Sequence, residues 1–392
     1  MDECVYLKPG KEIPVLRRHP WVFSGAVAKL PIFEEGEILP ICSSKGERLG
    51  WGMFNRRSSI IGRMVSFNPS ATRDEIIPQA ISDAVNFRLK WINGGSTTAY
   101  RLVNAEGDGL PGLIIDRYGD YLVMQVHALG IERVRSKVIE TLIKLLNPIG
   151  IYEKSNSPSR RQEGLKDRLE CTYGTVPARV IIQENSLKFS VDFVEGQKTG
   201  LFLDQRAMRE RIGELAKDRR ILNCFSYTGG FSLYALHGGA AFVDSVDISE
   251  KAVKGIEENI LLNGLGDAKN WANHATDVFG FLKENPLDHD LIILDPPAFA
   301  KKKQDLKNAC KGYRDLNRLA MQKVKEGALL LTCSCSQHLD EECFIKIIFE
   351  AALEAGRSVQ ILEKQRHGLD HPVSLFHPEG SYLKGLLLRI SD

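Results

Sequence analysis

Two apolar segments of the sequence each end in residues that could do chemistry. The stretch DLIILDPPAF places Asp295 and two prolines directly after one apolar run, and LLLTCSCS ends a second run with Cys333 and Cys335. A cysteine thiolate is a nucleophile, and prolines stiffen a turn and remove its backbone donors. In an open parallel sheet, ligands bind outside the carboxyl ends of the strands. If both runs are strands of such a sheet, the carboxylate and a thiol belong to one site.

Each of these features also has a purely structural explanation. A cysteine is usually buried as a small apolar side chain, and a double-proline turn can simply end a strand. Cys333 and Cys335 share one side of a strand only if it stays extended that far, in which case one lies in the core and the other is exposed. Their place at a strand end favours a nucleophile and leaves open which cysteine it is.

Three earlier turns could bind a nucleoside. The segment NCFSYTGGFS, residues 223–232, has glycines that admit a ligand to the backbone and a helix start with free N–H groups. It lacks the GxGxxG pattern, which argues against NAD. Asp247, about 20 residues further on, is placed to bind ribose hydroxyls; the alternative is helix capping, for which Ser249 is the better residue. Asp277 could bond an adenine amine with Val278 against the ring, or could be an N-cap.

From about residue 191, apolar strands alternate with helices, which predicts an open parallel sheet covered on both faces. The predicted strands are 221–225, 242–249, 290–295, 327–333, 358–364 and 383–390, and the predicted helices are 229–239 and 250–264.

Residues 1–72 carry short apolar runs broken by glycine and proline, which predicts a small all-β module. Basic side chains alternate there with aromatic ones, a composition that suits RNA. The alternative is that the aromatic residues form the core and the arginines are solvated. The residues concerned are Arg17, Arg18, His19, Arg56, Arg57, Arg63, Trp21, Phe23, Trp51 and Phe54.

Residues 73–190 mix helical and extended patterns. Helices are expected at 73–92 and 131–146. Hairpin segments are expected at 117–127 and 179–193, the second with Glu-Asn as its turn. The basic stretch 154–168 is predicted to be a loop that either contacts phosphates or is solvated.

Bulk composition is that of a soluble protein of two or three domains. The chain has 392 residues, 43% of them hydrophobic and 26% charged, with a net charge of +2, which neither requires nor excludes a local RNA-binding patch. No apolar run approaches the ~20 residues of a membrane span, and no signal-peptide core is evident, so a cytoplasmic protein is expected.

The eight cysteines include no CxxC pair, so zinc-site spacing is absent and no metal is expected.

The motifs together resemble a known family. TGGFS after the first strand, Asp247 after the second, DPPAF after the fourth and SCS after the fifth resemble class I S-adenosylmethionine-dependent RNA methyltransferases. The sequence is most similar to the RlmI-like large-subunit rRNA cytosine-5 methyltransferases. Further segments that match this family, in the right order, are RRHPWVFSGAV, LGWGMFNRRSSI, RLVNAEGDGLPGLIIDRYGD, VEGQKTGLFLDQRAMR and DHPVSLFHPEGSYLKGLLLRI.

The resemblance implies an α/β fold of three domains: a PUA-like RNA-binding β-barrel at 1–72, a central α+β (EEHEE-like) domain at 73–190, and a Rossmann-like class I methyltransferase domain at 191–392. It implies large-subunit rRNA as the partner, no membrane and S-adenosyl-L-methionine as the cofactor. It allows a homodimer without requiring one. The cofactor-binding residues that it implies are Gln197, Lys198, Thr199, Asp204, Arg206, Phe225, Ser226, Tyr227, Thr228, Gly229, Asp247, Ile248, Asp277, Val278, Asp295 and Pro296.

The resemblance also implies a mechanism. A cysteine thiolate adds to C6 of cytosine so that C5 can accept a methyl group, and Asp295 contacts the ring near N3. The SCS motif of the family selects Cys335, whereas the TCS motif of other RNA cytosine methyltransferases selects Cys333. Those other enzymes carry a second cysteine after the strand that ends here in DPPAF, so a two-cysteine release does not carry over.

Four alternatives to this function were weighed against the residues. An RNA methyltransferase acting on a base nitrogen would need no nucleophilic cysteine, although DPPAF is not the NPPY or NPPF pattern of amino-group methyltransferases. Uracil C5 would use the same cysteine chemistry. A non-catalytic RNA-binding ribosome-assembly factor would need neither Asp295 nor Cys335, and a small-molecule methyltransferase would not explain the basic and aromatic N-terminal module.

Overall fold

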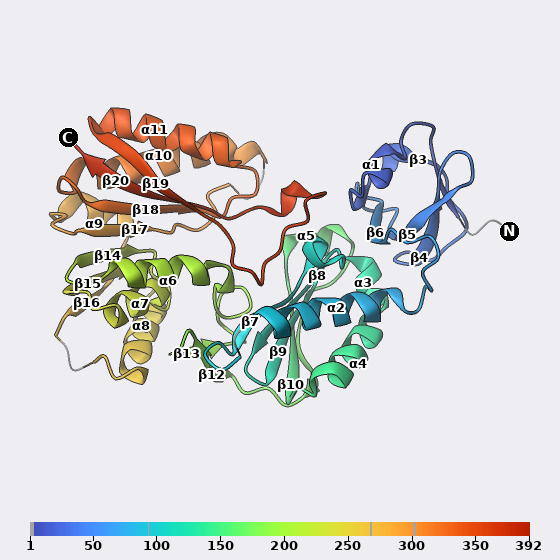
Figure 1. Ribbon diagram of the computed structural model, residues 1–392, viewed down its shortest axis with the longest axis horizontal. Coiled ribbons are helices and arrows are strands. Elements are labelled where there is room, and N and C mark those ends of the chain that lie inside the picture. The colour runs from blue at the N-terminus through green and yellow to red at the C-terminus, as the bar shows by residue number, and fades with distance from the viewer. Residues whose placement is uncertain (1–3, 93, 267–268, 301–302) are drawn as a thin grey trace. The chain divides into compact units, whose positions relative to one another are not determined.

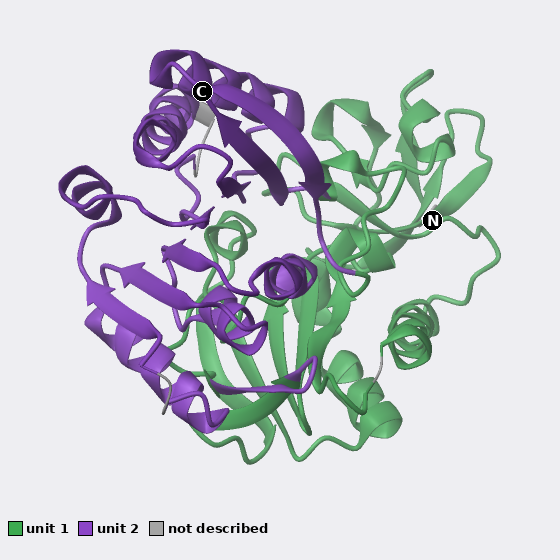
Figure 2. Ribbon diagram, turned by 60° about the vertical axis from the view of Figure 1, so that its left-hand side comes forward, with its two compact units in different colours: residues 1–183, 191–203, 369–380 green, residues 184–190, 204–368, 381–392 purple. Residues whose placement is uncertain are grey.

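The computed structural model describes residues 4–92, 94–266, 269–300 and 303–392. The chain divides into two compact units (Figure 2). Unit 1 comprises residues 1–183, 191–203 and 369–380, and unit 2 comprises residues 184–190, 204–368 and 381–392. The C-terminal region therefore contributes a short segment to unit 1 before it returns to unit 2.

The N-terminal part of unit 1 is a six-stranded sheet in the order β2-β6-β5-β4-β1-β3 (Figure 1). The expected all-β character is confirmed, with one short helix, α1 Ile13–Leu16. The strands are β1 Val5–Leu7, β2 Trp21–Val22, β3 Val27–Lys29, β4 Ile38–Cys42, β5 Arg48–Phe54 and β6 Gly62–Ser66.

The aromatic and basic residues in this sheet are divided between the core and the surface. Phe54 is fully buried in the core, whereas Phe23 is 51% exposed. Arg63 is not simply solvated, because its guanidinium pairs with Glu163 at 2.9 Å. The indole N–H of Trp21 donates to Glu106 at 2.9 Å.

The second part of unit 1 is a five-stranded sheet in the order β11-β10-β9-β8-β7. Strand β12 belongs to unit 1 up to residue 183, and β13 is divided, with residues 187–190 in unit 2 and 191–192 in unit 1. The strands are β7 Ala99–Asn104, β8 Leu113–Tyr118, β9 Tyr121–Val126, β10 Gly150–Ser155, β11 Arg168–Gly174, β12 Arg179–Glu184 and β13 Leu187–Asp192. The helices are α2 Ile76–Trp91, α3 Leu129–Arg133, α4 Arg135–Leu146 and α5 Pro158–Gln162.

Three local predictions for this region were wrong. The helix expected at 131–146 is interrupted at Val134. The supposed loop at 154–168 contains α5, whose Arg160 is buried and pairs with Glu132 at 2.8 Å. The hairpin turn lies one residue later than expected, at Asn185 and Ser186. Their φ angles of 48° and 69° suit a tight hairpin turn with both central residues left-handed.

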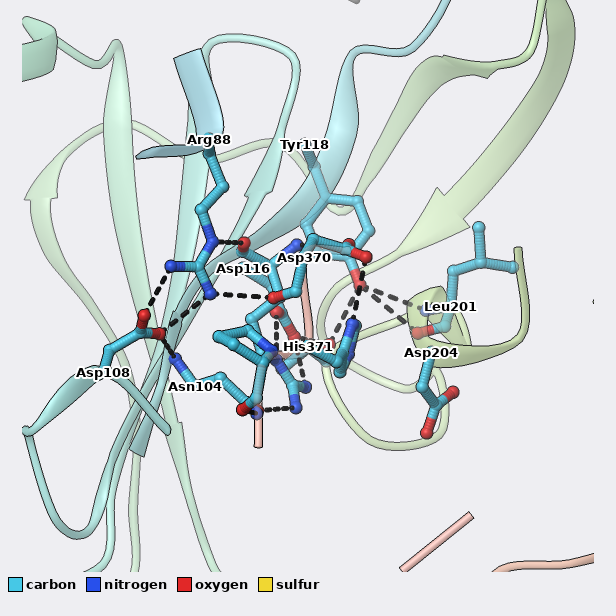
Figure 3. A network of polar contacts seen from close by, with 12 residues as sticks. Arg88, Asn104, Asp108, Asp116, Tyr118, Leu201, Asp204, Asp370 and His371 are labelled. Carbon is cyan, nitrogen blue, oxygen red and sulfur yellow. Dashed lines mark hydrogen bonds and ion pairs between the residues drawn. The ribbon is translucent and has the colours of Figure 1, made fainter. Parts of the chain in front are cut away.

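A buried polar network ties distant segments of unit 1 together (Figure 3). Arg88 is fully buried and binds Asp108 through two hydrogen bonds of 2.6 and 2.8 Å. It also donates to the backbone carbonyl of Asp370 at 2.8 Å. Arg101 pairs in the same network with Asp116 at 2.8 Å. The segment 369–380 is thus held by charge-assisted hydrogen bonds.

Unit 2 is built on a seven-stranded sheet in the order β16-β15-β14-β17-β18-β20-β19. The strands are β14 Arg220–Cys224, β15 Phe242–Asp247, β16 Trp271–Ala275, β17 Leu291–Leu294, β18 Leu329–Ser334, β19 Ser358–Gln365 and β20 Lys384–Ser391. The helices are α6 Arg206–Leu215, α7 Gly230–His237, α8 Glu250–Leu262, α9 Val278–Glu284, α10 Leu306–Lys323 and α11 Glu341–Ala355.

This sheet is mixed rather than wholly parallel, which corrects the prediction. Strands β14 to β18 pair in parallel, whereas β20 is antiparallel to both β18 and β19. Helices α10 and α11 lie on one face of the sheet and α6, α7 and α8 on the other (Figure 1). The carboxyl ends of the five parallel strands therefore lie along one edge, as a ligand site of this architecture requires.

Candidate active site

Asp295 and the two cysteines lie at the carboxyl ends of neighbouring parallel strands. Strand β17 pairs with β18 so that Leu294 lies opposite Thr332. Asp295 comes directly after Leu294, and Cys333 and Cys335 come one and three residues after Thr332. The structure therefore brings together the two strand ends that the sequence singled out.

The Asp295 carboxylate is held by a residue that the sequence analysis missed. Gln205, in a short 3-10 turn at Leu203–Gln205, donates from Nε2 to Oδ2 of Asp295 at 2.7 Å. Gln205 is buried, and Asp295 is half-buried. Pro296 is buried and Pro297 is exposed. Gln205 lies within the LDQR segment that matches the family, so the segment was noticed although this residue was not.

The two cysteines have different environments. Cys333 is fully buried within β18, and its thiol donates to the Met208 thioether sulfur at 3.8 Å. Burial raises the pKa of the Cys333 thiol well above its ordinary value, and Asp295 adds to this effect. Strand β18 ends at Ser334, and Cys335 is partly exposed just beyond it. The geometry therefore favours Cys335 as the accessible thiol.

The turn after β18 is fixed by side chains from two other elements. The Ser336 hydroxyl lies 3.1 Å from the Tyr313 hydroxyl of α10. Lys384 of β20 donates to the carbonyls of Ser336 and Leu339. Tyr313 and Lys384 were not among the predicted site residues, because contacts of this kind join segments far apart in the sequence.

The turn after β14 has an unusual backbone. Phe225 and Tyr227 have φ angles of 58° and 47°, and Gly229 has φ of 80°. A Cβ on Gly229 would lie 2.7 Å from Cγ2 of Ile256, so this position requires glycine. The Thr228 carbonyl accepts from Nδ2 of Asn259 at 2.9 Å. A turn with so many left-handed residues is stabilised by its surroundings, as is typical of ligand-binding segments.

Ser226 in this turn has an unsatisfied hydroxyl. The side chain is buried, and its Oγ has no hydrogen-bond partner among the described residues. Buried polar groups are normally paired, so this hydroxyl fits contact with a bound polar ligand.

Asp247 orders the neighbouring turns. Its Oδ2 accepts from the backbone N–H of Tyr227 and its Oδ1 from that of Ser249, both at 2.9 Å. Ser249 is the N-cap of α8, accepting from the Ala252 N–H, so the capping alternative for Asp247 is not needed. Ile248 is 74% exposed beside this carboxylate and offers apolar surface to a ring. The carboxylate retains lone pairs for ribose hydroxyls.

Asp277 is the N-cap of α9. Its Oδ2 accepts a hydrogen bond from the Gly280 N–H at 2.8 Å, which is the contact that the N-cap alternative predicts. The Val278 side chain is 2% exposed and packs in the core of unit 2. The Val278 side chain therefore has little surface to present to an adenine ring, which corrects the expectation that it packs against the ring. Only the backbone of Val278 is left for such a contact.

The predicted lead-in residues are divided between the units. Gln197 and Lys198 are exposed in unit 1, and Thr199 is buried there with its hydroxyl donating to Asp116 at 2.7 Å. Asp204 and Arg206 belong to unit 2. Asp204 is buried and accepts a hydrogen bond from the Tyr382 hydroxyl.

Comparison with known proteins places both ends of the chain in described families. Residues 170–388 match the S-adenosylmethionine-dependent methyltransferase family, and residues 5–67 match the PUA-like domain. The chain is 41% identical to the ribosomal RNA large subunit methyltransferase I of Aliivibrio fischeri strain MJ11, over 100% of both chains. It is 44% identical to the protein of that name from Tolumonas auensis, covering 99% of this chain and 100% of that one.

The chain belongs to the ribosomal RNA large subunit methyltransferase I family. The predicted family is therefore confirmed, as is an α/β fold with an N-terminal PUA-like domain and a Rossmann-like methyltransferase domain. As a member of this family, the protein uses S-adenosylmethionine as its cofactor. The unsatisfied Ser226 hydroxyl, the Asp247 carboxylate and the exposed Ile248 are suited to hold it.

Two solved structures have the same fold as this chain. A SAM-dependent methyltransferase from Streptococcus mutans superposes with a TM-score of 0.83 at 24% identity, covering 98% of this chain and 99% of that one. A methyltransferase complexed with SAH, SMU.776, gives a TM-score of 0.85 with the same identity and coverage. Within the described ranges, no helix has the length and apolar character to cross a bilayer.

Proposed function

We propose that the protein methylates C5 of a cytosine in large-subunit (23S) rRNA through a covalent bond between Cys335 and C6 of the base. The observation that carries this proposal is the partly exposed Cys335 just beyond β18, next to the strand that Asp295 directly follows. The names of its relatives supply the RNA class. Cys333 is the less suitable nucleophile, because burial raises its pKa and restricts access.

In the proposed mechanism, the Cys335 thiolate adds to C6 and forms a carbon–sulfur bond. The electrons of the 5,6 double bond shift, and C5 becomes nucleophilic. S-adenosylmethionine, when bound, would supply an electrophilic methyl group for this carbon, and its sulfur would keep the electron pair of the broken S–CH3 bond and leave as S-adenosylhomocysteine. After methylation a base removes the C5 proton, the double bond re-forms and the thiolate leaves. The target base must be unpaired or turned out of its stack to reach the thiol.

Asp295 is proposed to meet ring N3 as a carboxylic acid, so that its O–H group donates to N3 and offsets the negative charge that develops there during thiolate addition. The Gln205 hydrogen bond fixes the orientation of its carboxyl group. Prepositioned groups of this kind lower the barrier without reorganisation during the reaction. The same cysteine chemistry would serve uracil C5, which is the second candidate reaction.

The remaining assignments are also proposals. We propose the domain boundaries 1–72, 73–190 and 191–392, RNA binding by the PUA-like domain and a cytoplasmic location. The exposed Phe23 supports RNA contact, because aromatic side chains can stack on unpaired bases. The homodimer stays a prediction without a contact that argues for it.

A trapping experiment tests the covalent step. Large-subunit rRNA containing 5-fluorocytidine would be incubated with S-adenosylmethionine and the wild-type, Cys335→Ala or Cys333→Ala protein. Fluorine at C5 cannot leave as a proton does, so the adduct should persist as a protein–RNA band under denaturing conditions. We expect this band with the wild type and Cys333→Ala but not with Cys335→Ala. A band that persists in Cys335→Ala and disappears in Cys333→Ala would contradict the assignment of the nucleophile.

A further inference from the structure

A buried lysine holds the turn that carries Cys335. Lys384 lies on β20 opposite Ser334 of β18, and its side chain is only 5% exposed. Its Nζ donates to the Ser336 carbonyl at 2.8 Å and to the Leu339 carbonyl at 2.6 Å. One cation therefore binds two carbonyls of the segment that begins at Cys335, which fixes the course of the backbone there.

The lysine also interacts electrostatically with the thiol. Burial lowers the pKa of Lys384 to about 8, while Cys335 acts in the opposite direction and raises it. The side chain is therefore predominantly an ammonium ion at neutral pH. Because the interaction between two ionisable groups is mutual, an ammonium that is stabilised by a thiolate stabilises that thiolate in return.

Other ionisable groups face the same region. Cys335 also acts on Tyr313 of α10 and on Cys333 of β18, raising the pKa of each. These two neighbours carry no positive charge and do not favour a thiolate. Asp340 and Glu341 at the start of α11 face Lys384 and favour its charged form. Asp295 and Asp204 face Cys333.

We propose that Lys384 is a positioning residue for methyl transfer, which stabilises the Cys335 thiolate and holds the following turn in place for attack on the base. Its role in the reaction rests on the proposed function, whereas its effect on the Cys335 thiol does not. Sequence gives little sign of this role, because Lys384 lies 48 residues from Ser336, on the final strand.

The first test measures the Cys335 thiol directly. Alkylation of Cys335 by iodoacetamide would be followed by peptide mass spectrometry against pH in the wild type, Lys384→Met and Lys364→Met. Lys364 is the matched control, because it lies on neighbouring β19 and its side chain is 49% exposed. We expect Lys384→Met to raise the alkylation midpoint by about one pH unit, so that alkylation at pH 7 falls about tenfold. Lys364→Met should leave the midpoint unchanged.

Two results would overturn the inference. One is an alkylation midpoint in Lys384→Met equal to that of the wild type. The other is a change in the plateau rate alone, which would mean that Lys384 controls only the exposure of the thiol.

A second measurement leaves Lys384 in place, in case Lys384→Met does not fold. The pKa of Lys384 would be measured by NMR with carbon-13 at the lysine ε position, in the wild type and in Cys335→Ala. Removing the thiolate should lower the pKa of Lys384, because Cys335 raises it in the wild type. An unchanged pKa would contradict the proposed coupling.

Methyl-transfer assays distinguish a failure of this inference from a failure of the proposed function. If both hold, Lys384→Met lowers kcat more than it changes KM for RNA, and the acidic limb of the pH–rate profile moves to higher pH. If Cys335→Ala retains methyl transfer, the proposed function fails. The alkylation midpoint still decides whether Lys384 controls the thiol.

Discussion

Nε2 of Gln205 donates a hydrogen bond to Oδ2 of Asp295 across 2.7 Å, although the two residues lie 90 positions apart in the sequence. Gln205 is only 4% exposed, so solvent has little access to the donor of this bond. The pair sets the orientation of a carboxylate at the end of β17, beside the strand that leads to Cys335.

Replacing Gln205 should therefore impair catalysis more than folding. We expect Gln205→Leu to lower kcat by up to about 100-fold, because small displacements of a reacting group can cost that much. Gln322→Leu, at an exposed position on α10, should match the wild type. Single-turnover methylation assays with thermal unfolding as a folding check would measure both. Wild-type kcat in a folded Gln205→Leu protein would show that this hydrogen bond does not position Asp295 for the reaction.

Asp247 should control cofactor affinity. The Asp247→Asn change removes the negative charge and one of the two oxygens that accept backbone N–H bonds. Hydrogen bonds to charged groups contribute about 1.5–3 kcal/mol, so we expect binding of S-adenosylmethionine to weaken by roughly 10- to 100-fold. Isothermal titration calorimetry would measure this, with Glu257→Gln on the exposed face of α8 as the control. Equal affinity in the Asp247→Asn and wild-type proteins would remove Asp247 from the cofactor site.

The Arg88 network should stabilise unit 1 as a whole. Arg88→Met leaves the Asp108 carboxylate, which is 9% exposed, without its cation, and breaking a buried ion pair costs about 3–5 kcal/mol. Chemical unfolding should show this loss, whereas Lys90→Met at an exposed position of the same helix should change stability little. A loss below about 1 kcal/mol in Arg88→Met would mean that Asp108 is compensated by other groups.

The sequence was informative where the relevant signal is local. The strand ends at Asp247 and Asp295 follow apolar runs that folded as expected. The glycine turn at 228–230 was recognisable from the glycines themselves. Gly229 adopts a left-handed conformation that other residues rarely take, so glycine at this position is an informative signal. The N-cap alternatives at Ser249 and Asp277 were also visible, since capping depends on neighbouring residues.

Features that depend on distant contacts were missed. Strand β16, with the sequence WANHA, is half-buried and lacks the apolar run that marked its neighbours. The reversed direction of β20 depends on its partner strands, which a local pattern does not specify. Gln205 and Lys384 gain their roles only when folding brings them to Asp295 and to the turn after β18. Thr199 was expected at the cofactor, but its hydroxyl is engaged with Asp116 in unit 1.

The most direct test of the central claim is the identity of the methylated nucleoside. Unmodified large-subunit rRNA would be incubated with labelled S-adenosylmethionine and the wild-type, Cys335→Ala or Cys333→Ala protein, and the digested nucleosides would be analysed by mass. The proposed function predicts 5-methylcytidine with the wild type and its loss in Cys335→Ala, while Cys333→Ala remains active. Methylation that survives in Cys335→Ala, or a label on a base nitrogen, would contradict a covalent cytosine-C5 mechanism at this thiol.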